Sequence, residues 1–90
     1  MSQIWDREKR CWVKVKALKN LTFRSVPGFK FFLHKAYKES GFVVTEEISG
    51  ARVGDPQSSK TAAINSTRDK LKFIGVERLQ QAIVKAMKDY

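Results

Sequence analysis

The chain has 90 residues, of which 42% are hydrophobic, and its 18 Lys and Arg against 9 Asp and Glu give a formal net charge of +9. This length fits a single domain, residues 1–90, and the hydrophobic fraction excludes a disordered chain despite the large charge. Residues 1–10 are left as a candidate flexible, polar N-terminal segment. The single cysteine, Cys11, excludes an intramolecular disulfide and fits a reducing compartment. With no signal-peptide pattern and no run of roughly 18 apolar residues, we expect a cytoplasmic protein that does not enter a membrane.

Apolar residues alternate with polar ones over residues 11–17, which predicts a half-buried strand. One face of this strand would carry Cys11 and Val13, and the other Trp12, Lys14 and Lys16. Because Cys11 is in phase with the apolar face, we interpret it as a small buried residue.

The tripeptide Val26-Pro27-Gly28 predicts a turn, since proline fixes the first central φ and glycine accepts the positive φ that a type II turn needs next. A second strand would follow over residues 29–34. Its odd-numbered apolar residues would face the core. Its outward face would carry Lys30, Phe32 and His34.

The next segment predicts a hairpin loop at residues 39–41, a third strand over 42–48 and a tight turn at 49–50. A short strand at 51–53 and a loop at 54–58 would complete the β region. The sequence therefore predicts that the strands come first and lie side by side along one meander.

The apolar period becomes helical after residue 58, with a stripe that includes Leu71. Ser58 or Ser59 would cap this first helix, and Gly75 would end it. A second helix would run from Val76 nearly to Tyr90. The order predicts an α+β fold: an antiparallel meander of three to four strands, followed by two C-terminal helices packed on one face.

The inventory of reactive side chains argues against catalysis. His34 is the only histidine and Cys11 the only cysteine, and Glu46 and Glu47 are adjacent on a strand, so they point to opposite faces. No spacing of ligands indicates a metal site. We therefore expect no enzyme activity, no cofactor and no bound metal.

Basic residues are interleaved with aromatic ones on the polar faces of the first two predicted strands. Single-stranded nucleic acid is held in this way, because cations follow the phosphates while aromatic faces stack on bases. The candidate binding residues on the strands are Trp12, Lys14, Lys16, Lys30, Phe32 and His34. The alternative is that Phe32 or Trp12 lies beneath an N-terminal segment or a helix, and that the lysines deter edge pairing.

A second basic cluster lies at the start of the first predicted helix. Ser59 and Lys60 would stand at its N-terminus, where free backbone N–H groups attract anions. Arg68 and Lys72 follow, four residues apart and so on one helix face. The alternative is an ordinary serine cap with a solvated basic face.

This cluster resembles the start of the second helix in double-stranded RNA-binding domains. The resemblance covers residues 41–71 and rests on a glycine loop followed by Ser59-Lys60, with Ala63 four residues after the serine. It departs from the family's pattern at Thr61, where the family has a second lysine. It departs again at Thr67-Arg68, where the family has a pair of alanines, so no RNA-binding residue is carried over from the family.

Two further resemblances are broader. A hairpin followed by Thr61-Ala62-Ala63-Ile64 is similar to HicB-like antitoxins, and the whole chain resembles small orphan proteins of integron gene cassettes and phages.

We expect a non-enzymatic binding module whose partner is nucleic acid, since its charge favours polyanions. The alternative is a protein-interaction module, either a homodimer or an antitoxin-like adaptor with an acidic protein partner.

Overall fold

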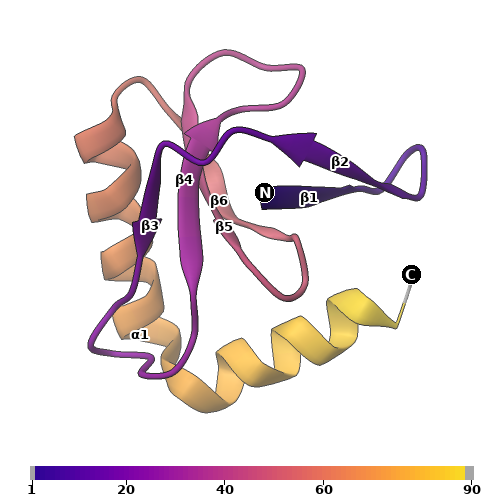
Figure 1. Ribbon diagram of the computed structural model, residues 1–90. Helices are drawn as coiled ribbons and strands as arrows, with labels where there is room; N and C mark the ends of the chain where they lie inside the picture. The colour runs from indigo at the N-terminus through magenta and orange to yellow at the C-terminus, as the bar shows by residue number, and fades with distance from the viewer. Residues whose placement is uncertain (1, 89–90) are drawn as a thin grey trace.

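The computed structural model describes residues 2–88 (Figure 1). The fold is α+β, as predicted, with six strands followed by one helix. The elements are β1 (Ser2–Asp6), β2 (Cys11–Val15), β3 (Lys19–Leu21), β4 (Phe31–Lys35), β5 (Phe42–Glu46), β6 (Arg52–Gln57) and α1 (Lys60–Met87). Among these residues, no helix is both long enough and apolar enough to cross a membrane.

The strands form two antiparallel sheets instead of one meander. The larger sheet has four strands in the order β3-β4-β5-β6, and β1 and β2 form a separate two-stranded sheet. The strand predicted at residues 11–17 therefore belongs to the smaller sheet. Figure 1 shows the first half of α1 along one side of the four-stranded sheet and the β1–β2 hairpin on the other, while the second half of α1 passes the end of the sheet toward the hairpin's side.

Two of the predicted turns are present. Phe29 N donates to Val26 O at 3.4 Å, which closes the turn before β4. Gly50 N donates to Glu46 O at 3.0 Å in the turn between β5 and β6. The buried carboxylate of Glu46 also accepts from the Ser49 backbone N–H at 2.7 Å, so this turn is held from within.

Strand β6 extends through residues 54–57, for which the sequence predicted a loop. Pro56 in this segment has no backbone N–H to donate, so a proline would not be tolerated in a central strand. However, β6 lies at the edge of the sheet, where one side of the strand needs no partner. A register shift between Phe42 and Val44 of β5 accommodates the irregular pairing.

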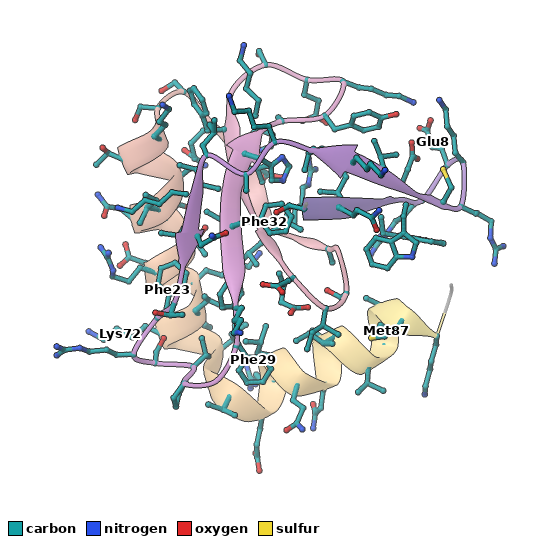
Figure 2. All side chains as sticks on the ribbon, in the orientation of Figure 1. Glu8, Phe23, Phe29, Phe32, Lys72 and Met87 are labelled. Atoms are coloured by element: carbon teal, nitrogen blue, oxygen red, sulfur yellow. The ribbon has the colours of Figure 1, made fainter. Side chains whose placement is uncertain are left out.

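The main core lies between the four-stranded sheet and α1. Phe31, Leu33 and Val44 from the sheet cluster there with Leu71 and Leu79 from the helix. Figure 2 shows Phe23, which belongs to the same cluster, on the α1 side of the sheet. The alternation predicted for β4 and the apolar stripe around Leu71 are therefore confirmed.

The two predicted helices are a single element in the structure, α1, with a bend inside it. Gly75 has φ 74° and ψ 178°, which are not helical angles, and the helix resumes directly after it. Glycine was predicted here as a C-terminal cap, and its positive φ breaks the helix without ending it. Tyr90, near which the second helix was expected to end, lies outside the described residues.

Residues 2–6 form a strand, although residues 1–10 were predicted as a candidate flexible segment. In the β1–β2 hairpin Ile4 is paired with Val13 and Trp5 with Trp12. Ile4 is buried, and Trp5 N donates to Gly50 O at 3.0 Å. These contacts attach the hairpin to the sheet as a second layer, opposite the first half of α1.

Candidate nucleic-acid interface

The basic side chains are all at the surface. All 18 Lys and Arg lie within residues 2–88, and each is exposed. Lys38 pairs with Asp6 at 3.8 Å, and Arg52 pairs with Glu39 at 3.3 Å. In contrast, the lysines around the hairpin form no ion pair with any residue of the described segment; these are Lys14, Lys16, Lys19 and Lys30.

A groove of about 670 Å³ lies between the β1–β2 hairpin and the β3 side of the larger sheet. Trp12, Lys30 and Phe32, all predicted as binding residues, line this one groove. We call it the hairpin groove. Its other polar lining residues include Gln3, Asn20, Thr22 and Glu47.

Trp12 has a fixed position at the wall of the hairpin groove. It faces Trp5 across the hairpin with ring centroids 5.5 Å apart and an interplanar angle of 71°. Its ring also packs against Gly50, at the β5–β6 turn. The side chain still has 39% of its surface exposed, so a ligand in the groove can reach it.

Phe32 and His34 are buried, with 1% and 2% of their surface exposed, so the prediction that they face solvent is wrong. They do lie on the opposite face of β4 from Phe31, as the alternation requires. That face is covered by the β1–β2 hairpin, and Figure 2 shows Phe32 on the side of β4 toward it. The alternative, an aromatic residue beneath an N-terminal segment, is confirmed for Phe32.

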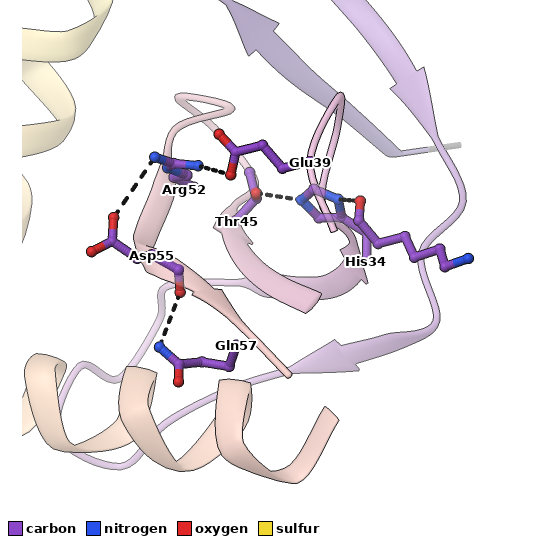
Figure 3. A network of polar contacts seen from close by, with 7 residues as sticks. His34, Glu39, Thr45, Arg52, Asp55 and Gln57 are labelled. Atoms are coloured by element: carbon purple, nitrogen blue, oxygen red, sulfur yellow. Dashed lines mark hydrogen bonds and ion pairs between the residues drawn. The ribbon is translucent and has the colours of Figure 1, made fainter. Parts of the chain in front are cut away.

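His34 is held by two hydrogen bonds inside the protein (Figure 3). Nδ1 lies 2.7 Å from Lys35 O, and Nε2 lies 2.6 Å from Thr45 Oγ1. Because a carbonyl only accepts, Nδ1 carries the proton and Nε2 accepts from the Thr45 hydroxyl. Burial lowers the pKa of His34, against an opposing effect of the Lys35 carbonyl. The ring is therefore neutral at pH 7 and does not add to the positive surface.

A second hollow, of about 640 Å³, lies on the other side of the hairpin and includes Asp6, His34 and Thr45 in its lining. Asp6 accepts hydrogen bonds from Glu8 N at 2.9 Å and Lys9 N at 3.1 Å. The hydrogen bond from Lys9 lowers the pKa of Asp6, although burial opposes this effect. Asp6 thus organises the β1–β2 turn, a role that the sequence analysis missed.

The helix cluster lies on the opposite side of the sheet from the hairpin groove. Ser59 is the N-cap of α1 and accepts from Ala62 N at 3.1 Å, as an ordinary serine cap does. The Lys60 ammonium lies 5.8 Å from the centre of the Phe42 ring. Arg68 donates to Asn65 Oδ1 at 3.0 Å, and Lys72 points outward from α1 in Figure 2. The structure therefore does not combine the two predicted clusters into one site.

Cys11 is exposed, which contradicts its assignment to the core. It stands at the start of β2, in a two-stranded hairpin that has only one side against the sheet. Among residues 2–88, no group of three or more His, Cys, Asp or Glu side chains could hold a metal ion. Comparisons with protein-family models, with curated proteins and with solved structures find no match for this chain.

Proposed function

We propose that this chain is a small, non-enzymatic nucleic-acid-binding protein whose interface is the hairpin groove and the lysines around it. The observation that carries the proposal is the coincidence of a concave groove, an accessible indole and lysines that form no ion pair within the described residues. Lys30 lines the groove, and Lys14 is paired across the hairpin with the lining residue Gln3 and shares a strand face with Trp12. This combination is typical of surfaces that bind a sugar–phosphate chain and its bases together.

The charge supports the proposal through its effect on counterions. A net charge of +9 attracts polyanions and accelerates their encounter with the protein. Each phosphate that a lysine neutralises releases condensed cations, so that log K falls with log salt by roughly 0.7 per contact for a single strand. Binding through several lysines is therefore strongly salt-dependent.

The test is a titration of a labelled single-stranded oligonucleotide, followed by fluorescence anisotropy at several salt concentrations. We expect binding at low salt that weakens steeply as salt is added. The double variant Lys14→Gln/Lys30→Gln should reduce the salt slope by about 1.4, the equivalent of two contacts. Absence of binding at low salt would refute the proposal.

A matched control separates local contacts from overall charge. Lys70→Gln/Lys85→Gln removes the same two charges, from exposed positions on α1. We expect this variant to keep most of the affinity and of the salt slope. Equal losses in the two double variants would show that the hairpin groove is not the interface.

A second candidate function, a protein-interaction module, is favoured by apolar side chains that α1 exposes. Phe73 has 84% of its surface exposed and Val84 has 53%, and Met87 and Val76 are also exposed. Basic residues such as Lys72 accompany them on the helix. Since two copies with a charge of +9 repel each other, an acidic protein partner fits this surface better than a homodimer does.

Self-association can be measured directly. Light scattering over a dilution series should show a monomer if the partner is a different, acidic protein. A dimer that Phe73→Ser dissociates would instead assign the exposed α1 residues to a homodimer interface.

A further inference from the structure

We infer that the hairpin groove receives one unpaired nucleobase, and that it favours adenine or cytosine over thymine or uracil. The inference rests on the proposed function and deepens it, because it specifies single strands and a class of base. It depends on three features of the groove: its shape, the position of Trp12 and the polar groups of its lining.

The groove has room for a base that has left the stack. Its volume of about 670 Å³ falls within the range of roughly 300–1,000 Å³ that is usual for ligand pockets. Its walls come from both layers of the protein, with Gln3 and Trp12 from the hairpin and Asn20 and Lys30 from the larger sheet and the turn before β4. A base inside a duplex is stacked and paired and cannot enter such a recess, whereas an unpaired base can.

Trp12 provides a stacking surface that is already in place. Its ring is fixed by the edge-to-face contact with Trp5 and by packing against Gly50, so little side-chain freedom remains to be lost on binding. Phe32 forms a buried apolar part of the same lining. Stacking of a base on an aromatic side chain is expected to contribute about 5- to 150-fold in Kd.

The polar lining can read the edge of the base. The amides of Gln3 and Asn20 both donate and accept, whereas the carboxylate of Glu47 only accepts. Adenine and cytosine carry an exocyclic amino group that donates to such acceptors. Thymine and uracil present a carbonyl at the equivalent position. A carbonyl and the Glu47 carboxylate are both acceptors, so they would repel each other and form no hydrogen bond.

The experiment compares labelled oligo-A, oligo-C and oligo-T of roughly ten nucleotides with a mixed-sequence duplex of equal length, all at low salt. We expect oligo-A and oligo-C to bind more tightly than oligo-T, and each single strand more tightly than the duplex. Trp12→Leu should weaken oligo-A binding about 5- to 150-fold while leaving the salt slope unchanged.

Glu47→Gln keeps the inference testable if Trp12→Leu fails to fold, because Glu47 is exposed. A glutamine amide donates as well as accepts, so this variant should bind oligo-T as tightly as oligo-A. Glu77→Gln, at an exposed position on α1, removes the same charge and should keep the wild-type preference.

The outcomes separate this inference from the proposed function. Failure to bind any oligonucleotide at low salt would overturn both. Salt-dependent binding with no preference among the single strands and the duplex, unchanged in Glu47→Gln, would overturn the base pocket alone and leave binding through the lysines intact.

Discussion

Gly50 lies against the indole of Trp12, where the tip of the β5–β6 hairpin meets the β1–β2 hairpin. A Cβ atom at Gly50 would stand 2.9 Å from Trp12 Cη2 and 2.8 Å from Trp5 N. The Gly50 carbonyl also accepts the hydrogen bond from Trp5 N. Both the attachment of the β1–β2 hairpin to the sheet and the position of the Trp12 ring therefore require a residue without a side chain at position 50.

We predict that Gly50→Ala destabilises the protein by about 1–3 kcal/mol, because the added methyl group overpacks this contact. Urea denaturation followed by tryptophan fluorescence measures the effect, since Trp5 and Trp12 both lie in the hairpin. Gly54→Ala is the control: Gly54 also has a positive φ, of 82°, but no atom lies within 4 Å of its added Cβ. Equal losses in the two variants would show that backbone strain, and not contact with Trp12, limits Gly50.

Phe32→Ala should lower the free energy of unfolding by about 3–5 kcal/mol, because it removes a fully buried aromatic ring. Lys30→Ala, two residues away and exposed, should change it by less than about 0.5 kcal/mol. Chemical denaturation of both variants is the measurement. Wild-type stability in Phe32→Ala would contradict the covering of this sheet face by the hairpin.

His34 should make stability depend on pH in the mildly acid range. Its pKa in the folded protein is lowered from 6.5, so below pH 6.5 the unfolded chain binds a proton that the folded protein resists. Stability is therefore complete above this pH and falls as the pH drops toward the lowered folded value. His34→Gln should remove this dependence, which denaturation midpoints at about pH 7 and about pH 5 can show. A slope that persists in the variant would assign it to other groups.

Asp6 should act at lower pH. The folded pKa of Asp6 is lowered from 3.8, chiefly by the hydrogen bond from Lys9 N, so the stabilisation is present above pH 3.8 and is lost as the pH falls through the folded value. Asp6→Asn should be less stable than the wild type at neutral pH and lose less on acidification. Glu8→Gln, at the exposed neighbouring position, should behave like the wild type. Thermal unfolding at neutral pH and near pH 3 compares the three proteins.

Local patterns in the sequence predicted much of the larger sheet and of α1. The alternation around Phe31, the turn at residues 26–28 and the cap at Ser59 each depend on neighbours within a few positions, so they could be predicted correctly. Periodicity also placed Phe32 opposite Phe31. It could not show that this second face is covered, because the cover is a hairpin whose first strand, Ser2–Asp6, has no clear alternation.

The candidate site could be predicted only in part, because some of its residues stand out in the local sequence and others are brought together only by tertiary packing. Trp12 and Lys30 stood out as an aromatic and a basic residue on polar strand faces, and the structure brings both to one groove. Gln3, Asn20 and Glu47 come from three other segments, and only tertiary packing places them beside Trp12. No local signal marks such residues.

The bend at Gly75 keeps the longest dimension of the molecule shorter than a straight α1 would be. A straight helix of 28 residues would be about 42 Å long, whereas the protein measures 31 Å along its longest axis. The combination of φ 74° and ψ 178° is accessible essentially to glycine alone. A side chain at this position would favour one straight helix, which would carry Leu79 and Ile83 away from the core. Gly75→Ala should therefore enlarge the hydrodynamic radius and expose both the apolar face of the C-terminal half of α1 and the part of the core that it covered. A second copy can cover these two surfaces by exchanging its own C-terminal half, which would give a domain-swapped dimer.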